Sequence, residues 1–506
     1  MFKGARVVKN SLVQKIITKK FDASRFKNKT AGSPKDHFTR GNQNMSQTKK
    51  NLEKNGVKYC FASFVDLHGI PKGKTVPIDH FERMLRGSEL VTGAALDGLG
   101  QGPNDDELAI HPDPDAIQQL PWRQEIAWAP GHLKYHDNPW PMCSRNVLSQ
   151  QIERARGHGL QFNLGIECEV YLVRLENGKP VPHNPNDTTE KAAYDFILTL
   201  DNLDWLDEVV SHMNSMGWHV HSFDHEDSNG QYEFDFAYSE AMQMCDRFTL
   251  WRVLTKEIAR QYGWEATFMP KPYAERTGSG AHFNMSLSSI KTGKNISGSK
   301  TDKRGCGLSK LAYQFIAGMK KHAPAIVATT CPTVNSYKRL IKTGSMTGFT
   351  WAPVFISYGG NNRTHMLRVP MVRPRIEGKH DPKSDSPYLS AARWECRAVD
   401  TAMNPYLATA MALGAGLEGI ENDLDPGDPI NENMYELSDK QLNRMGVKQL
   451  PRTLLEATEA FSKDSLAKEV MGEALFDSFI ENKTKEWWDF HNSISEWEID
   501  TYLTKF

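Results

Sequence analysis

Carboxylate, imidazole and guanidinium side chains recur on four short stretches that alternate polar and apolar residues. These stretches are residues 165–171, 231–236, 281–287 and 393–397. Because successive residues of a strand point to opposite faces of a sheet, each stretch would press one apolar face into a core. The other face would line a cavity with polar groups, namely Glu167, Glu169, Gln231, Glu233, Asp235, His282, Asn284, Ser286, Arg393, Glu395 and Arg397.

The carboxylates predict a site for divalent cations. Carboxylates on one cavity face repel each other unless a cation neutralises them, and Mg²⁺ or Mn²⁺ does so while keeping waters for substrate phosphates. A single Glu is more often an exposed salt-bridging residue, but the repetition in four strands favours a shared cavity. The candidate ligands suffice for two metal ions: Glu167, Glu169, Glu226, Glu233, His282 and Glu395.

Arginines supply the second half of the candidate site. The guanidinium group recognises carboxylates and phosphates with a planar fork, and arginine clamps beside metal ions are general requirements of phosphoryl transfer. We therefore expect a carboxylate substrate and a nucleoside triphosphate. No Gly-x-x-x-x-Gly-Lys-Ser/Thr motif is present, which excludes a P-loop enzyme. The arginines are Arg339, Arg363, Arg368, Arg393 and Arg397.

The elements around these residues predict an α+β protein of more than one domain, for which 506 residues suffice. Residues 46–145 read as a small α+β domain that contains a strand over Tyr59–Val65 and a second strand ending near Pro77. Residues 146–506 alternate helices with the half-polar strands. This larger part includes an amphipathic helix from Leu308 to Met319 and a helix over Pro405–Ile420 that Asn404 would cap.

Charge and cysteine usage exclude several classes of protein. Residues 1–44 carry eleven Lys/Arg and two Asp, whereas the rest of the chain carries 50 basic and 60 acidic residues. This acidic remainder argues against nucleic acid as the main partner. The seven cysteines form no Cys-x-x-Cys pair, which favours small buried thiols in a reducing compartment. No apolar run is long enough to cross a membrane.

The basic N-terminal extension, residues 1–45, leaves three interpretations open. Val8, Leu12 and Ile16 share one helical face among lysines, as in a mitochondrial transit peptide, although Asp22 and Asp36 count against that class. The extension is otherwise a disordered basic tail, or it precedes a true initiator at Met45. The expected location is cytoplasmic, with mitochondrial as the alternative.

Ordered motifs from about residue 50 to the C-terminus resemble the glutamine synthetase family. The segments Gly348–Pro353 and Gly359–His365 bring the likeness nearest to type III glutamate–ammonia ligases and γ-glutamylmethylamide synthetases. The resemblance implies an N-terminal β-grasp domain and a catalytic domain with a curved antiparallel sheet flanked by helices. The other matching segments are residues 165–169, 225–233, 268–272, 278–282, 335–340, 361–363, 393–397 and 404–407.

The family forms γ-glutamyl phosphate from glutamate and ATP, and ammonia or an amine then displaces phosphate. The resemblance implies two metal sites and assigns the other residues to substrates. One metal would be bound by Glu169, Glu226 and Glu233, and the other by Glu167, His282 and Glu395. Glutamate and the transferring phosphoryl would contact Glu169, Gly278, His282, Arg339 and Arg397, and ATP would contact Ser286, Arg363, Arg368 and Arg393. The catalytic residues would be Asp66, Glu169 and Arg339.

The resemblance also implies an assembly, because in this family the small domain completes the site of a neighbouring subunit. Asp66 would help to deprotonate ammonium there. We expect a ring-shaped homo-oligomer, a dodecamer of two stacked hexamers. Tyr435 falls where bacterial members carry an adenylylated tyrosine, although an ordinary surface tyrosine explains it equally well.

Three positions depart from the family pattern. Trp351 replaces a flap glutamate that accepts a proton from ammonium, and an indole cannot accept one. Asn284 replaces a second histidine, and residues 371–390 form an insertion near the expected nucleotide entrance. Our first expectation is ammonia as the acceptor, with methylamine or another small alkylamine as the alternative. A non-catalytic relative and a phosphagen-type kinase are the rival classes, and amine-dependent phosphate release distinguishes them.

Overall fold

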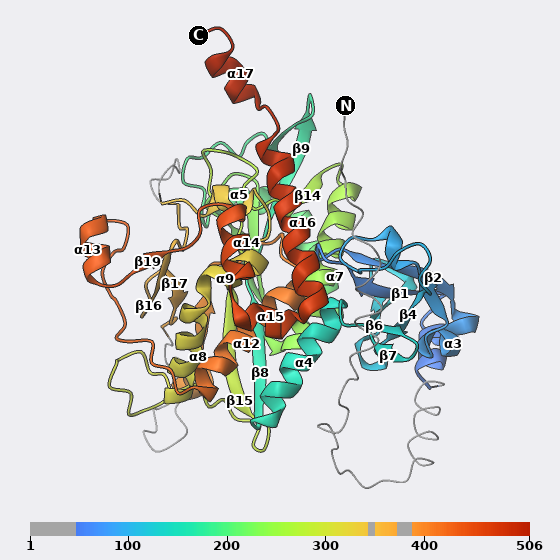
Figure 1. Cartoon of the computed structure of the whole chain (residues 1–506). Coiled ribbons are helices and arrows are strands. Elements are labelled where there is room, and N and C mark those ends of the chain that lie inside the picture. Colours follow the sequence, from blue (N-terminus) through green and yellow to red (C-terminus); the bar gives the residue numbers. More distant parts are fainter. Residues whose placement is uncertain (1–46, 343–349, 372–386) are drawn as a thin grey trace, which may run out of the picture. The chain divides into compact units, whose positions relative to one another are not determined.

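The computed structural model describes residues 47–342, 350–371 and 387–506 (Figure 1). The N-terminal extension and most of the 371–390 insertion therefore lie outside the described residues. The chain forms two compact units, one that includes residues 47–63 with Gly73–Trp140, and one made of Phe64–Lys72 with Pro141–Phe506. Each unit has its own sheet structure.

The smaller unit is built on a mixed sheet, as expected for a β-grasp domain. Its strands follow the order β2-β1-β6-β4-β3, and β5 and β7 also pair with β6. Strand β1 runs parallel to β6, and the other pairs described along β6 are antiparallel. Both predicted strands are present. The bounds are β1 Tyr59–Val65, β2 Pro71–Pro77, β3 Glu89–Val91, β4 Leu108–Pro112, β5 Gln118–Leu120, β6 Arg123–Tyr135 and β7 Asn138–Pro139, with helix α3 Phe81–Leu85.

The larger unit contains two sheets. One has the order β10-β9-β12-β11 with β14 paired to β9, and the other has the order β13-β8-β15-β18-β17-β16-β19. The bounds are β8 Leu160–Ile166, β9 Cys168–Glu176, β10 Lys179–Pro182, β11 Val220–His225, β12 Gln231–Phe236, β13 Ser239–Glu240, β14 Glu265–Thr267, β15 Phe283–Ser289, β16 Phe355–Gly359, β17 His365–Arg368, β18 Trp394–Cys396 and β19 Lys448–Gln449.

The structure corrects two features of the predicted strands. The stretch 165–171 is not one strand, because β8 ends at Ile166 and β9 begins at Cys168. At the intervening Glu167 the chain leaves the partner of β8, which is β15, and joins the partner of β9, which is β12. The second sheet is also not wholly antiparallel, since β16 and β17 run parallel.

Helices cover the sheets of the larger unit, and Figure 1 shows α8, α12 and α4 side by side. Both predicted helices are confirmed as α8 and α12. The bounds are α4 Ser144–Gly157, α5 Phe196–Asp201, α6 Leu203–Ser215, α7 Ala241–Gln261, α8 Lys310–Lys321, α9 Ala323–Thr330, α10 Ser336–Arg339, α11 Pro387–Ser390, α12 Pro405–Glu421, α13 Asp439–Arg444, α14 Leu454–Ser462, α15 Ser465–Met471, α16 Glu473–His491 and α17 Glu496–Tyr502.

Helix α12 is the buried centre of this helical layer. Its residues are almost all buried from Pro405 to Gly419, and the Asn404 side chain caps its first turn as predicted. A helix that is hydrophobic on every side must be surrounded by other elements, and α12 packs against α4, α7, α8, α9 and α15. At Gly416 a Cβ atom would lie 2.2 Å from the ring of Phe315, so only glycine permits this close approach to α8.

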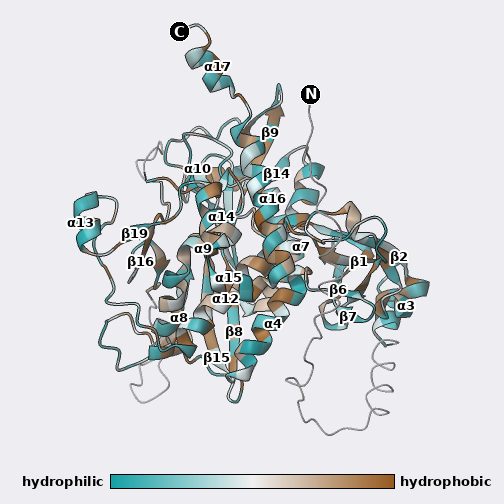
Figure 2. Cartoon of the chain, in the orientation of Figure 1, coloured by the Kyte–Doolittle hydropathy of each residue, from teal (hydrophilic) through white to brown (hydrophobic). Residues whose placement is uncertain are grey.

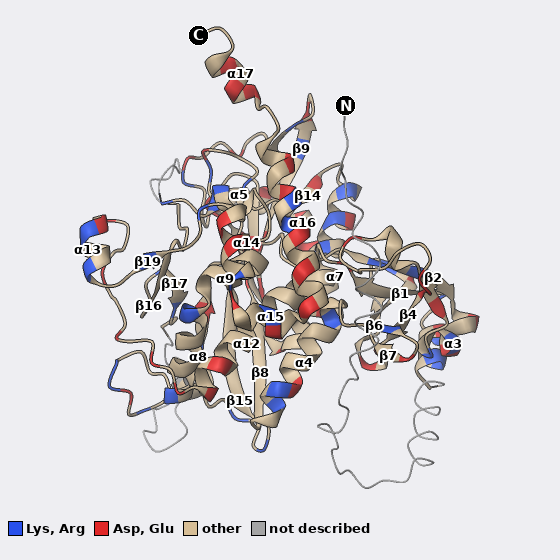
Figure 3. Cartoon of the chain, in the orientation of Figure 1, with Lys and Arg blue, Asp and Glu red and all other residues tan. Residues whose placement is uncertain are grey.

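Hydrophilic and charged residues occur on helices other than the buried α12. Figure 2 colours the short helix α13 mainly hydrophilic, and Figure 3 shows charged residues along α16 and on α13 and α17. Within residues 47–342, 350–371 and 387–506, no helix combines the length and the apolarity that crossing a bilayer requires.

Candidate active site

The polar strand faces meet where the two sheets of the larger unit join. In the first sheet β12 pairs with β9 so that Glu233 lies opposite Glu169. In the second sheet β15 pairs with β18 so that Asn284 lies opposite Glu395. Glu167 stands at the junction, and its amide donates to the carbonyl of His282 at 3.1 Å. The break in the predicted strand therefore brings side chains of both sheets together.

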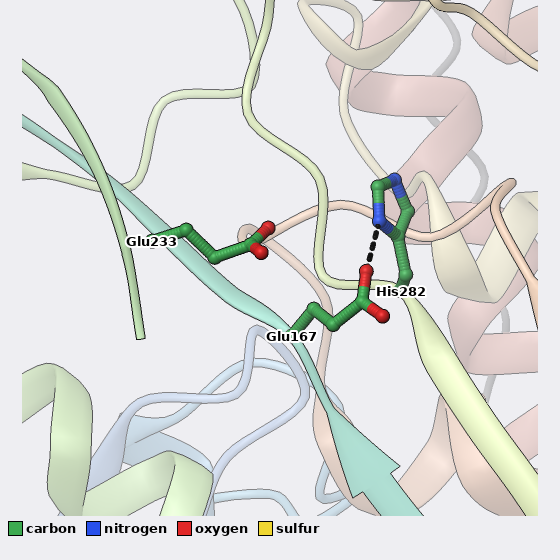
Figure 4. A group of neighbouring side chains, drawn as sticks. All are labelled: Glu167, Glu233 and His282. Atoms are coloured by element: carbon green, nitrogen blue, oxygen red, sulfur yellow. Dashed lines mark hydrogen bonds and ion pairs between the residues drawn. The ribbon is translucent and has the colours of Figure 1, made fainter. Parts of the chain in front are cut away.

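Three of these residues form a compact group that could hold a cation. Glu167, Glu233 and His282 each offer a ligand atom, and these atoms lie within 4.8 Å of one another (Figure 4). The Nδ1 atom of His282 lies 2.8 Å from Oε2 of Glu167. The carboxylate oxygens of this group suit Mg²⁺ or Mn²⁺. This group combines Glu233, from one of the metal sites that the resemblance implies, with Glu167 and His282 from the other.

Glu169 is held next to this group by neutral donors. Gln231 Nε2 and the Gly280 amide each donate to its Oε2 atom at 2.8 Å. Its Oε1 atom lies 3.9 Å from Nε2 of His282. A Cβ atom on Gly280 would lie 2.6 Å from His282, and 2.9 Å from both Arg339 and Glu169. Gly280 therefore lies at the point where these side chains converge, and only glycine leaves room for them there.

Several carboxyl groups of the cavity have raised pKa values, because they are buried close to one another. Burial and the nearby charge of Glu226 raise the pKa of Glu169 to about 8. Burial, then repulsion from Glu167 and Glu226, raises the pKa of Glu233 well above the usual value. Burial raises the pKa of Glu226 as well. Groups that are costly to ionise when buried become favourable ligands once a cation is bound, so the donor set fits a divalent metal.

His282 carries the protonation state that a metal ligand needs. Burial and the adjacent Arg397 guanidinium hold the pKa of His282 well below its usual value. Its imidazole is therefore neutral near pH 7, with a ring nitrogen available to a cation.

Glu395 differs from the other candidate ligands because guanidiniums already neutralise it. Arg368 Nη1 donates to its Oε2 atom and Arg397 Nη1 to its Oε1 atom, each at 2.6 Å. Its carboxylate lies 3.9 Å from Nδ1 of His282 and is fully buried. Metal binding by Glu395 would have to share or replace these two contacts.

Two buried guanidinium groups, one of which also pairs with Glu395, point to an anionic ligand. Arg339 and Arg397 are each 5% exposed, and Arg339 Nη2 donates to the Arg397 carbonyl at 3.2 Å. In the described part of the chain, Arg339 Nη1 and Arg397 Nε are buried without a protein partner. Buried donors are nearly always satisfied, so these two atoms indicate the position of a bound carboxylate or phosphate. Gly278 lies here too, since its Cβ would be 2.8 Å from Cγ of Arg339.

The residues expected to bind ATP are only partly together. Arg393 lines a cavity of about 540 Å³, and its Nε atom donates to Asn284 at 2.9 Å. Asn361, another lining residue, accepts from Arg368 Nη2 at 2.7 Å. Ser286 is buried beside Asn163 and Arg363 is exposed, and neither lines this cavity. The lining consists of Ser299, Lys300, Gly305, Cys306, Gly307, Leu308, Gly360, Asn361, Val369, Pro370, Met371, Leu389, Ala392 and Arg393.

The Asp66 side chain is hydrogen-bonded within its own turn. Its Oδ1 atom accepts from the amides of His68 at 3.0 Å and Ile70 at 2.9 Å, and its carbonyl accepts from Asn404 Nδ2 at 2.8 Å. These described contacts belong to the turn and to the start of α12 rather than to the carboxylate cluster. Its role in the site of a neighbouring subunit stays a prediction.

Sequence reasoning missed Gly280 and Tyr194 as residues of the site. Tyr194 has a φ of 64°, and its amide donates to the His225 carbonyl at 2.8 Å. Burial and the carboxylate of Glu226 raise the pKa of Tyr194, whereas Arg363 acts in the opposite direction. No local pattern signals this tyrosine, because its loop reaches Glu226 only in the folded chain.

Comparisons with known proteins agree with this geometry. A family model described as glutamine synthetase, catalytic domain, matches residues 141–502. A glutamate–methylamine ligase from Methyloversatilis universalis is 38% identical over 462 residues, which cover 91% of this chain and 99% of the relative. A glutamine synthetase from Rhizobium meliloti is 33% identical over 448 residues, which cover 88% and 97% of the two chains.

A solved structure described as "GmaS/ADP complex-Conformation 1" has the same fold. It is 34% identical to this chain with a TM-score of 0.80, and the match covers 90% of this chain and 99% of that one. The strand faces, the buried carboxylates and these relatives lead to one conclusion. The chain belongs to the glutamine synthetase family and is an ATP-dependent carbon–nitrogen ligase.

Proposed function

We propose that this protein joins methylamine, or another small alkylamine, to the γ-carboxylate of glutamate at the expense of ATP. The observation that carries this choice is the 38% identity to a glutamate–methylamine ligase across 99% of that protein's length. This reverses the order expected from sequence, which had ammonia first. Ammonia remains the second candidate, because a glutamine synthetase is 33% identical over a similar length.

The buried carboxylates and arginines support the ligase chemistry. Glu167, Glu233 and His282 would hold Mg²⁺ or Mn²⁺, with Glu169 and Glu226 beside them. When bound, the cations would offset the repulsion between carboxylates and polarise the phosphates of ATP. Without them the site repels the negatively charged substrates that it has to bind.

The unpartnered guanidinium nitrogens support a direct role for arginine in substrate binding. Arg339 and Arg397 would bind a carboxylate of glutamate and then the phosphoryl group, while Arg368 and Arg393 would neutralise phosphates of ATP. An oxygen of the γ-carboxylate attacks the γ-phosphorus and ADP leaves. The amine nitrogen then attacks the acyl carbon, phosphate leaves, and the nitrogen loses a proton.

The acceptor of that proton and the assembly belong to the same proposal. Asp66 of one subunit would accept the proton in the site of its neighbour, within a ring of two stacked hexamers. Gly278 would contact the amino end of glutamate, and Ser286 and Arg363 the nucleotide. Light scattering on the purified protein tests the assembly, and a monomer with full activity would contradict the shared site.

The deciding experiment is a steady-state assay of phosphate release with the full chain, glutamate, ATP and Mg²⁺. Ammonia, methylamine and ethylamine are compared as acceptors, and mass spectrometry identifies the amide. We expect the highest kcat/KM with methylamine or ethylamine and one amide formed per phosphate released. A higher kcat/KM with ammonia contradicts the choice of amine, and phosphate release without amide favours a kinase or hydrolase.

A further inference from the structure

Trp351 has a backbone conformation that bulky residues rarely adopt. Its φ is 52°, in the left-handed region, and its side chain is 39% exposed. A large aromatic residue in this region is strained, and such residues persist where the surrounding structure holds them, often at functional sites.

The two neighbours of Trp351 are fixed by hydrogen bonds while its indole reaches the surface. Thr350 Oγ1 donates to the Ile341 carbonyl at 2.7 Å. On the other side, the hydroxyl of Tyr435 donates to the Ala352 carbonyl at 2.7 Å. Both Thr350 and Ala352 are buried. The chain is therefore held immediately before and immediately after the strained residue.

The two hydrogen bonds that hold Thr350 and Ala352 on either side of Trp351 are called the clamp below. The clamp lies near the arginines of the site. The ring of Tyr435 lies 6.2 Å from the ring of Phe355, and burial raises the pKa of Tyr435 to about 12. The charges of Arg397 and Arg339 act on the same hydroxyl and oppose that rise. These are the arginines with unpartnered buried nitrogens. Ile341, which accepts from Thr350, follows Arg339 by two residues, and its amide donates to the Arg339 carbonyl at 2.8 Å, so the clamp lies beside one of these arginines.

We propose that Trp351 determines which amine is used, and that Tyr435 is a positioning residue that acts through it. This inference rests on the proposed function. An indole offers an apolar face to a methyl group and a π-face to an alkylammonium ion. Ammonia has no methyl group, so it gains little from the apolar contact. Holding the indole in one place before the amine arrives makes that contact specific. The same side chain excludes water from the acyl phosphate.

The test compares kcat/KM for methylamine with kcat/KM for ammonia in the full-length protein and its variants. We expect Trp351→Ala to lower this ratio about tenfold or more, since one methyl group in an apolar pocket is worth about 10–200-fold. It should also raise phosphate release from glutamate and ATP without amine. Trp351→Phe should keep most of the wild-type ratio, and Tyr435→Phe should lower it while the protein stays folded.

A double variant separates positioning from a general structural effect. If Tyr435 acts through Trp351, adding Tyr435→Phe to Trp351→Ala should not lower the ratio further. Tyr358→Phe is the matched control, because the Tyr358 hydroxyl also donates to a backbone carbonyl, that of Gly427 at 2.6 Å, and lies outside the clamp. This control should leave the ratio at the wild-type value.

Three results would overturn the inference. The first is an unchanged ratio in Trp351→Ala. The second is a double variant in which Tyr435→Phe lowers the ratio by the same factor as it does in the wild type. The third is a change in Tyr358→Phe as large as that in Tyr435→Phe. The choice between methylamine and ammonia in the wild type tests the proposed function by itself. The variants are scored relative to the wild-type ratio, whichever amine that ratio favours, so the two failures are distinguishable.

Discussion

In this site the absence of a side chain can matter as much as a direct contact. Gly280 illustrates this, because it donates its amide to Glu169 and leaves the space that His282 and Arg339 occupy. A methyl group at this position would approach all three side chains closer than Cβ atoms are found to do. The absence of a side chain is therefore a condition for the convergence of the acidic and basic halves of the site.

Replacing this glycine tests its role. We expect Gly280→Ala to lower kcat/KM at least about 100-fold, because a displacement of about 1 Å in a site can have that effect. The control is Gly157→Ala at the end of α4, where nothing lies within 4 Å of the added Cβ. Steady-state assays and circular dichroism make the comparison. Activity near the wild-type level in a folded Gly280→Ala protein would show that the side chains adjust freely.

At the scale of elements, the link between β8 and β9 assembles the site. Alternation of polar and apolar residues predicts Glu167 and Glu169 on one face of one strand. In the structure the chain changes sheets at Glu167, and hydrogen bonding to His282 rather than strand periodicity fixes this residue. Alternation therefore identified the right side chains, but the arrangement of partners along β15 and β12 determined their positions.

A buried ion pair joins three helices of the larger unit. Arg145 of α4 donates from Nη2 to Asp246 of α7 at 2.9 Å, and the Tyr406 hydroxyl of α12 donates to the same carboxylate at 2.6 Å. The side chains of Arg145 and Asp246 are 3% and 8% exposed. Tyr406 lies in the first turn of α12, where its amide donates to the Asn404 cap at 3.1 Å. We infer that it stabilises the helical layer rather than the chemistry.

Removal of one partner should be costly. Asp246→Ala should lower the free energy of unfolding by about 3–5 kcal/mol, because it leaves a buried guanidinium uncompensated. Tyr406→Phe should cost about 1.5–3 kcal/mol. Lys310→Ala is the control, since Lys310 pairs with Asp423 at an exposed position and such pairs contribute little to stability. Urea denaturation measures the differences, and equal effects of Asp246→Ala and Lys310→Ala would contradict this assignment.

At the scale of the whole molecule, the buried carboxylate cluster opposes folding when no cation compensates its charge. The pKa of Glu169 rises to about 8, that of Asp224 to about 7 and that of Asp235 to about 6, each chiefly through burial. A raised pKa means that the folded protein binds more protons than the unfolded chain between the ordinary carboxyl pKa and about pH 8. The stability of the metal-free protein should therefore fall as pH rises through that window.

Thermal unfolding at several pH values with EDTA or with Mg²⁺ measures this effect. We expect Tm in EDTA to decrease from pH 7 to pH 8, because the free energy of unfolding falls by about 1.4 kcal/mol per pH unit for each extra proton that the folded protein binds. Added Mg²⁺ should raise Tm more at pH 8 than at pH 5. Glu233→Gln should flatten the pH dependence in EDTA. Asp187 and Asp464 have lowered pKa values and titrate at more acidic pH, so they do not mask the effect. The lowered pKa values of His282 and His365 act in the opposite direction below the ordinary histidine pKa, so the decrease is scored above pH 7. A Tm that rises from pH 7 to pH 8 in EDTA would contradict the effect.

The chain by itself determined the polar strand faces, the two predicted helices of the larger unit, the Asn404 cap and the metal-binding chemistry. These features depend on residue type and on short periodicities, and local backbone geometry is enough to express them. Only the tertiary structure decided that two sheets meet at Glu167, that arginines neutralise Glu395, that Gly280 makes room for three side chains, and that Tyr435 holds the chain beside Trp351. Such contacts join residues far apart in sequence, so no local pattern encodes them.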